Sequence, residues 1–191
     1  MNIVITGSPG VGKHTIGKAF ASRLTSSYIL DINELVISNN LVLDSSGDSD
    51  SGLEVDVNSL SCVINKLLIN SNAEYNIIIG HLAPYVIDSN PNYVFVLRRS
   101  PYELIKVYQN RGYSLKKIKE NLSSEVLGVI FCDSVQQFGN KVIEIDTTKL
   151  SPDELVDLLI LSIKNQSDVT QFVDWLPLIN SNGDLWRFFD Y

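Results

Sequence analysis

The chain has 191 residues, of which 45% are hydrophobic and 19% charged, and 15 basic against 22 acidic residues give a net charge of −7. This length fits one α/β domain with its own core, and the acidic balance argues against broad nucleic-acid binding, which needs a clustered basic face. Two cysteines, Cys62 and Cys132, cannot build a disulfide framework or a thiolate zinc site, and we expect buried thiols. We find neither a signal peptide nor the ~20 apolar residues of a membrane span, so a soluble, cytoplasmic protein is expected.

The first fifteen residues carry the strongest signal. Residues 2–6 are mostly β-branched, which predicts a strand buried on both faces. The glycine-rich run 7–13 follows directly, and apolar residues at helical spacing then predict a helix to about Leu24. Glycines in such a loop let backbone N–H groups approach phosphate oxygens, while the helix N-terminus and Lys13 add positive charge. The pattern predicts a phosphate-binding loop; the alternative is a glycine-rich turn without a ligand.

The loop departs from the strict pattern by one residue. His14 follows Lys13 where Ser or Thr is usual, and Thr15 comes next. The Gly-Lys-x-Thr variant is common among nucleoside monophosphate kinases. We therefore expect the Thr15 hydroxyl to hold Mg²⁺ beside the phosphates.

The middle of the chain predicts two further strand–helix units. Residues 28–31 form a strand that ends at Asp31, and Asn33 is expected to cap a short helix. The polar, acidic segment 44–52 lacks the Gly and terminal Glu of a calcium loop, so a mobile loop is expected. A helix over 57–68, strands over 76–80 and 93–97, and a helix from Pro101 to about Asn110 follow.

The last third completes an α/β pattern. Ser114 is expected to cap one helix, whose apolar face runs to Ile130 through positions 118, 122, 126 and 129. A fifth strand over 141–145 precedes a helix that starts at Pro152. Five apolar strands separated by helices predict a mostly parallel sheet with helices on both faces. Residues 166–191 form an aromatic-rich extension that we expect to pack on the domain; a partner-binding peptide is the alternative.

Four motifs together resemble the adenylate kinase isoenzyme 6 family, a group of small P-loop kinase-like ATPases that includes ribosome-assembly factors. They are GSPGVGKHT from residue 7, VFVLR at 94–98, RGYSLKKIKENLSSEV at 111–126 and IDTTKLSPDEL at 145–155. The resemblance covers about residues 1–165 and implies a P-loop nucleoside monophosphate kinase-like fold. It also implies a monophosphate-binding segment over about 31–55 and a short lid over about 110–120. The ATP phosphates would be lined by Gly10, Val11, Gly12, Lys13, His14 and Thr15.

The resemblance also implies roles for individual residues outside the loop. Arg111 would close over the ATP phosphates and stabilise the transferring group; the alternative is a solvated arginine at a helix end. Arg98, at the carboxyl end of a strand, is a candidate for a phosphate contact. Asp31 is a candidate for contacts to the monophosphate or to Mg²⁺-bound water, and a helix-capping role is equally open.

Two positions depart from the family pattern. The family has Asp-x-His after the third strand, with the His linked to hydrolysis; this chain keeps His81, a candidate catalytic residue, but has Ile79 in place of the Asp. An arginine that binds the monophosphate in some members falls at Ile37. Without that cation, recognition of the AMP phosphate weakens.

Three functions remain open from the sequence. The first is an enzyme that transfers the γ-phosphoryl group of Mg²⁺-ATP to AMP or a related nucleoside monophosphate, with Lys13, Arg111 and His81 as its catalytic residues and ATPase activity alongside. The second is an ATPase assembly factor that binds a basic protein of the small ribosomal subunit, which the acidic charge would suit. The third is a P-loop kinase for another small metabolite.

Overall fold

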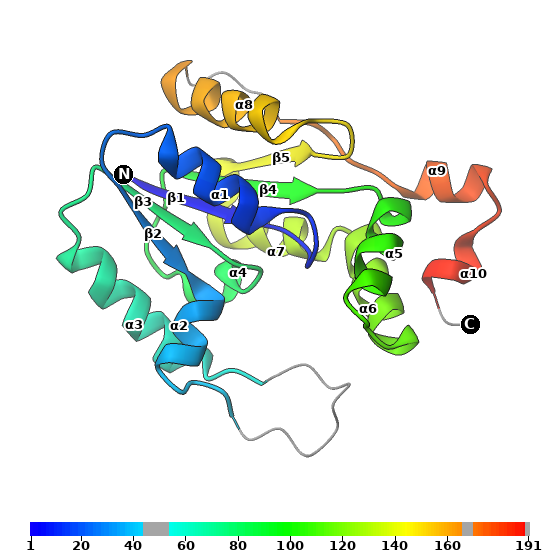
Figure 1. Ribbon diagram of the computed structural model, residues 1–191, viewed down its shortest axis with the longest axis horizontal. Helices are drawn as coiled ribbons and strands as arrows, with labels where there is room; N and C mark the ends of the chain where they lie inside the picture. The colour runs from blue at the N-terminus through cyan, green and yellow to red at the C-terminus, as the bar shows by residue number, and fades with distance from the viewer. Residues whose placement is uncertain (44–53, 166–169, 190–191) are drawn as a thin grey trace.

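The computed structural model describes residues 1–43, 54–165 and 170–189. Its centre is a five-stranded, fully parallel sheet in the order β2-β3-β1-β4-β5 (Figure 1). The strands are β1 (Asn2–Thr6), β2 (Ser27–Asp31), β3 (Tyr75–Ile79), β4 (Tyr93–Arg98) and β5 (Val142–Asp146). The predicted architecture, with all five strands within two residues of their expected bounds, is confirmed.

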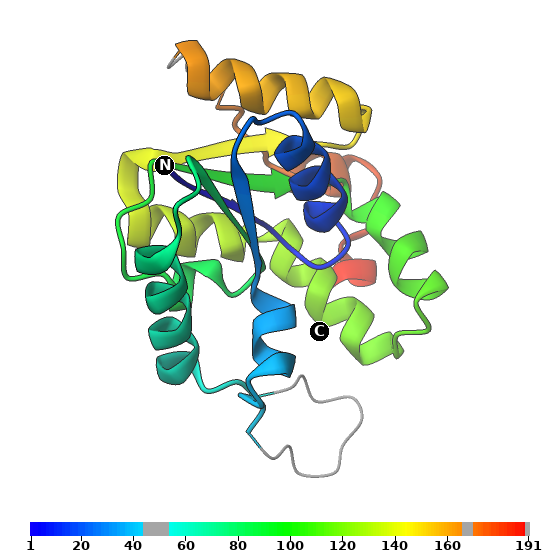
Figure 2. The same cartoon turned by 60° about the vertical axis from the view of Figure 1, so that its left-hand side comes forward.

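Helices cover both faces of the sheet, as Figures 1 and 2 show. One face carries α1 (Lys13–Ser22) and α8 (Pro152–Asn165), and its core cluster extends to α5 (Pro101–Asn110) and α6 (Leu115–Val126). The other face carries α3 (Val57–Asn70), α4 (Ala83–Val86) and α7 (Val129–Phe138), which is followed by the 3₁₀ turn Gly139–Lys141. The short helix α2 (Ile32–Ser38) follows β2 directly.

Each central strand divides its apolar side chains between two cores. In β1, Ile3 and Ile5 face the α1 side, whereas Val4 faces the α3 side. In β3, Ile77 and Ile79 alternate in the same way with Ile78. Successive side chains of a strand point to opposite faces, so a continuous run of branched residues is what a sheet covered on both faces requires.

The order of the strands fixes where a ligand can bind. Strand β1 lies between β3 and β4, and the chain leaves β1 toward one side of the sheet and β4 toward the other. In open α/β sheets the crevice at this reversal, beyond the carboxyl ends of the strands, is the usual ligand site. The loop after β1 occupies this position (Figure 1).

Three local expectations are wrong. The helix expected to run from Ser114 through Ile130 is two helices, because Gly128 adopts a left-handed backbone (φ 64°) that ends α6 and begins α7. Helix α2 is capped by Asp31, whose carboxylate accepts from the backbone N–H groups of Asn33 and Glu34, and not by Asn33. Both cysteines are free but exposed.

The aromatic extension packs on the domain, as expected, over its described residues 170–189. It contains α9 (Leu176–Ser181) and α10 (Leu185–Phe188). Trp175, Ile179 and Phe188 are buried in the same core cluster as the α1 face of the sheet. The acidic segment expected at 44–52 lies outside the described residues. Among the helices that the structure describes, none has the length and apolar character needed to cross a membrane.

Candidate active site

The loop between β1 and α1 can be built only with glycine at its two ends. Gly7 has φ 135°, and a Cβ there would lie 2.2 Å from the Leu97 carbonyl oxygen of β4. Gly12 has φ 99°, and a Cβ there would extend into open space with no other atom nearer than 4.0 Å. The backbone thus borders an open cradle at the N-terminus of α1, where N–H groups and the helix dipole favour an anion.

Lys13 lies at the base of this cradle. Its side chain is 6% exposed, and Nζ donates to the carbonyl oxygens of Gly7 (2.8 Å) and Ser8 (2.9 Å). Burial, and next the positive charge of Arg111, lower the pKa of Lys13 from 10.5 to about 7, against the opposing effects of Glu125 and Asp31. A buried cation with so low a pKa is a group prepared for an anionic ligand.

A cavity of about 670 Å³ opens above the loop. The loop and α1 form its floor, α2 with Val55 forms one wall, His81 and Leu82 after β3 form a second, and the segment from Arg111 along α6 forms a third. Of the residues predicted from the sequence, the cavity is lined by Gly10, Gly12, Lys13, His14, Thr15, His81 and Arg111. The structure therefore brings most of the predicted site together.

Two predicted residues contact the cavity only indirectly. The Val11 side chain is buried in the core, which leaves its backbone alone for a ligand. Asp31 is 6% exposed: one carboxylate oxygen caps α2, and the other lies 2.6 Å from Nε2 of His14, which lines the cavity. Asp31 thus orients His14 and ties the end of β2 to the first turn of α1.

His81 differs from His14 in its electrostatic environment. It follows β3 and is partly buried, and desolvation, with the nearby Lys13 charge, lowers its pKa to about 4. His81 is therefore neutral at physiological pH and offers the cavity one hydrogen-bond acceptor and one donor. Ile79, which replaces the family's aspartate, is fully buried in the core and contributes no charge here.

Arg98, a candidate for a phosphate contact from the sequence, is enclosed in the fold and does not line the cavity. Its side chain is 2% exposed. Nε donates to Glu125 at 2.8 Å, Nη1 to Glu144, and Nη2 to the backbone oxygen of Glu125 at 2.6 Å. Every nitrogen of the guanidinium therefore has a protein partner inside the fold, so Arg98 is left out of the proposed site.

The sequence analysis did not single out three residues of α6 that line the cavity. Lys117, Asn121 and Ser124 line the cavity from one face of α6. Their spacing of four and three residues places them in a row on a helix, a signal that was available in the sequence. Tyr113 also lines the cavity; its ring stacks on Tyr108 at 5.7 Å, and the Lys117 ammonium lies 5.0 Å from its centre.

Comparisons with known proteins identify the family of this chain. A family profile described as an AAA domain matches residues 3–128. A protein named "Putative adenylate kinase" from Methanocaldococcus jannaschii is 35% identical over 191 residues, covering 100% of this chain and 97% of the relative. One of the same name from Methanococcus maripaludis is 34% identical over 188 residues, covering 94% and 99%. The chain belongs to the family of these relatives, and the match includes residues 166–191, which the resemblance left out.

Solved structures confirm the fold. The tunicamycin resistance protein of Deinococcus radiodurans has a TM-score of 0.58 at 15% identity, covering 85% of this chain and 95% of that one. Shikimate kinase from Aquifex aeolicus has a TM-score of 0.53 at 18% identity, covering 87% and 98%. At such identities the likeness concerns the fold alone, which is that of the P-loop kinases.

Proposed function

We propose that this protein is a nucleotide kinase that transfers the γ-phosphoryl group of Mg²⁺-ATP to a nucleoside monophosphate, with AMP as the first acceptor to test. The observation that carries the proposal is the buried Lys13 ammonium at the base of an open glycine cradle, within a cavity that Arg111 also lines. Membership in a family whose relatives are named "Putative adenylate kinase" supports the same reaction.

Backbone N–H groups and two cationic side chains together bind the ATP phosphates. The backbone of Gly10 and Gly12 and the N-terminus of α1 bind phosphate oxygens. Lys13 exchanges its two loop carbonyls for phosphate oxygens, and Arg111 approaches from the wall that it forms with α6, so two cations neutralise charge on the transferring group. Catalysis of this kind is mostly positioning and charge neutralisation.

The site also fits Mg²⁺. Thr15 is exposed and lines the cavity in the first turn of α1, where its hydroxyl is available as a ligand. The described residues contain no group of three or more His, Cys, Asp or Glu that could hold a metal ion. Mg²⁺ would therefore enter with the nucleotide, held by Thr15 and phosphate oxygens, and would neutralise charge on the phosphates when bound.

His81 is suited to orient the attacking group. Because its pKa is about 4, it stays neutral and can accept a hydrogen bond from an acceptor hydroxyl or a water molecule. A protonated histidine at this position would add positive charge beside Lys13, and that repulsion is one reason for the low pKa.

A second candidate function is an ATPase that assists assembly of the small ribosomal subunit by binding a basic ribosomal protein. One observation favours it: residues 24–65 contain no Lys, Arg or His but seven Asp and Glu. The α2 wall of the cavity is therefore without a cation, and Ile37 lies there with 70% of its surface exposed. Such a wall attracts a basic partner more readily than the phosphate of a nucleoside monophosphate. In this second function, water accepts the γ-phosphoryl group of ATP.

Product analysis tests both functions. The protein is incubated with Mg²⁺-ATP, with and without AMP, and ADP and phosphate are quantified. Lys13→Ala serves as the blank, and Lys18→Ala, on the exposed side of the same helix, serves as the matched control. ADP formed only with AMP and without phosphate supports the kinase. Phosphate release that is indifferent to AMP supports the ATPase, and full activity in Lys13→Ala contradicts both.

A further inference from the structure

A buried polar cluster lies directly behind the phosphate loop. It joins Arg98 at the end of β4, Glu125 of α6 and Glu144 of β5, each at most 2% exposed. One positive and two negative groups are thus enclosed in the fold, at sites far apart in the sequence. Buried charges are costly unless every group is hydrogen-bonded, so the positions of the partners are closely determined.

Glu125 connects this cluster to the loop. Its Oε2 accepts a hydrogen bond from Ser8 Oγ at 2.6 Å, while Oε1 accepts from Arg98 Nε at 2.8 Å. Ser8 belongs to the phosphate loop, and its carbonyl oxygen is one of the two that hold Lys13 Nζ. Glu125 therefore fixes the residue that in turn holds the lysine, and its negative charge favours the protonated form of Lys13.

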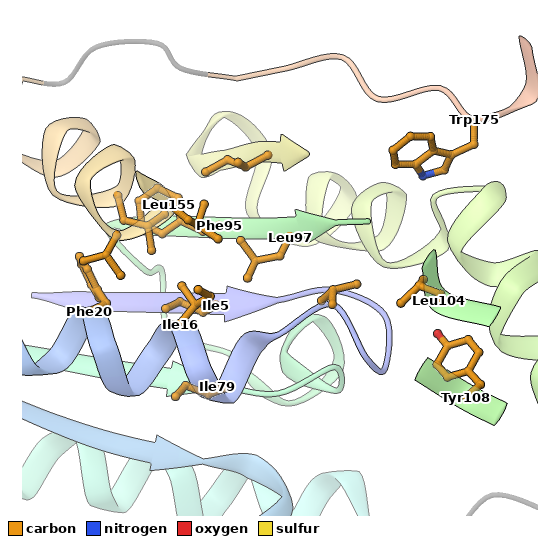
Figure 3. Packing of buried hydrophobic residues seen from close by; sticks show 14 of the residues in the cluster. Ile5, Ile16, Phe20, Ile79, Phe95, Leu97, Leu104, Tyr108, Leu155 and Trp175 are labelled. Atoms are coloured by element: carbon orange, nitrogen blue, oxygen red, sulfur yellow. The ribbon is translucent and has the colours of Figure 1, made fainter. Parts of the chain in front are cut away.

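The C-terminal extension connects to the same two carboxylates. The indole Nε1 of Trp175 donates to Glu125 Oε1 at 3.1 Å, and the backbone N–H of Val173 donates to Glu144 Oε2 at 3.1 Å. Figure 3 shows the Trp175 ring directed from the extension into the molecule, above the end of β4. Trp175 is 7% exposed, whereas Trp186, the other tryptophan of the extension, is 64% exposed.

We propose that Glu125 is a positioning residue for the phosphate loop and that the extension, through Trp175, holds Glu125 in place, so that docking of the extension and nucleotide binding are coupled. The proposal rests on the proposed function in one respect, that the loop binds nucleotide phosphates. The chain of contacts runs from Trp175 to Glu125, then to Ser8 and finally to Lys13.

Nucleotide affinity tests the proposal. Trp175→Phe removes one N–H donor and keeps an aromatic ring, Ser8→Ala removes one hydroxyl, and Trp186→Phe is the matched control. By calorimetry at a temperature well below melting, we expect the Kd for Mg²⁺-ATP to weaken about tenfold in Ser8→Ala, the effect of one hydrogen bond to a charged group, and about threefold in Trp175→Phe. Trp186→Phe leaves the Kd unchanged. The double variant Ser8→Ala/Trp175→Phe binds no more weakly than Ser8→Ala alone, because both act through Glu125.

Four other outcomes are decisive. Equal Kd values in Trp175→Phe and wild type, or additive effects in the double variant, would overturn the proposal while leaving the proposed function intact. A wild-type protein that does not bind Mg²⁺-ATP would overturn the proposed function and the coupling with it. If Trp175→Phe does not fold, the fluorescence emission of Trp175 is measured in the Trp186→Phe protein. We expect this emission to change when Mg²⁺-ATP is added, and an unchanged emission would reject the coupling.

Discussion

The low pKa of Lys13 makes nucleotide binding dependent on pH in a direction that the structure determines. Burial and Arg111 lower this pKa from 10.5 to about 7 in the free protein. A bound polyphosphate places negative charge beside the ammonium and raises the pKa again. Above pH 7 the free protein has mostly neutral Lys13 and the complex has charged Lys13, so binding takes up one proton.

The loss of nucleotide affinity at high pH can be calculated from the Lys13 pKa of about 7. At pH 8 only about a tenth of the free protein carries a charged Lys13, so the affinity is about tenfold below its low-pH plateau, and at pH 9 it is about a hundredfold below. At pH 6 most of the free protein is already charged, and the affinity is near that plateau. The affinity therefore begins to fall near pH 7 and continues to fall up to the pKa that Lys13 has in the complex.

Calorimetry in buffers of different ionisation enthalpy measures the proton directly. For Mg²⁺-ATP we expect uptake of about 0.9 proton at pH 8 and about 0.1 at pH 6, from a free-state pKa of about 7. Lys13→Arg is the control, because a guanidinium stays charged throughout and removes the uptake. Equal uptake in wild type and Lys13→Arg at pH 8 would refute the reasoning, and would mean that the Gly7 and Ser8 carbonyls keep the ammonium protonated.

Three substitutions test other parts of the structure. Arg98→Met leaves two buried carboxylates without their cation and should lower the unfolding free energy in urea by about 3–5 kcal/mol, whereas Arg99→Met, which loses a partly exposed pair at 3.9 Å, should cost less than about 1 kcal/mol. Ile37→Arg adds a cation at an exposed position of the cavity wall and should raise kcat/KM for AMP at least about tenfold in a coupled assay; no increase would show that the acceptor phosphate binds elsewhere. Asp31→Ala should cost about 1 kcal/mol of stability in thermal unfolding, and Asn33→Ala much less, because Asp31 caps α2; the reverse order would contradict that assignment.

The features that could be predicted from the sequence are those encoded locally. Runs such as Ile77–Ile79 specify a strand covered on both faces, and the glycines in 7–13 permit the positive φ angles that this loop adopts. Strand and loop together place Lys13 without any knowledge of the rest of the chain. Most of the floor of the site is therefore readable from the first fifteen residues.

Two of the wrong expectations, for Arg98 and for the helix across 114–130, depend on partners far apart in the sequence. Arg98 follows a strand, as a ligand-binding arginine would, but its partners Glu125 and Glu144 lie 27 and 46 residues further along the chain. The break between α6 and α7 at Gly128 also depends on Arg98. A Cβ at position 128 would lie 3.1 Å from Arg98 Nη1, so the glycine leaves room for this guanidinium. Helical periodicity across 114–130 contains no trace of that constraint.

The distribution of charge in the cavity separates the donor side of the site from the acceptor side. The cations that line it are Lys13 at the start of α1, Arg111 after α5 and Lys117 in α6, while the α2 wall comes from a stretch without any basic residue. The local potential is therefore positive where ATP phosphates would bind, although the chain carries a net charge of −7. If this separation is correct, Ile37→Arg changes the KM for AMP and leaves the Kd for Mg²⁺-ATP within about twofold, because screening limits a new charge on the far wall to a small effect at the loop. A comparable change in both constants would mean that the two sides of the cavity act as one anion site.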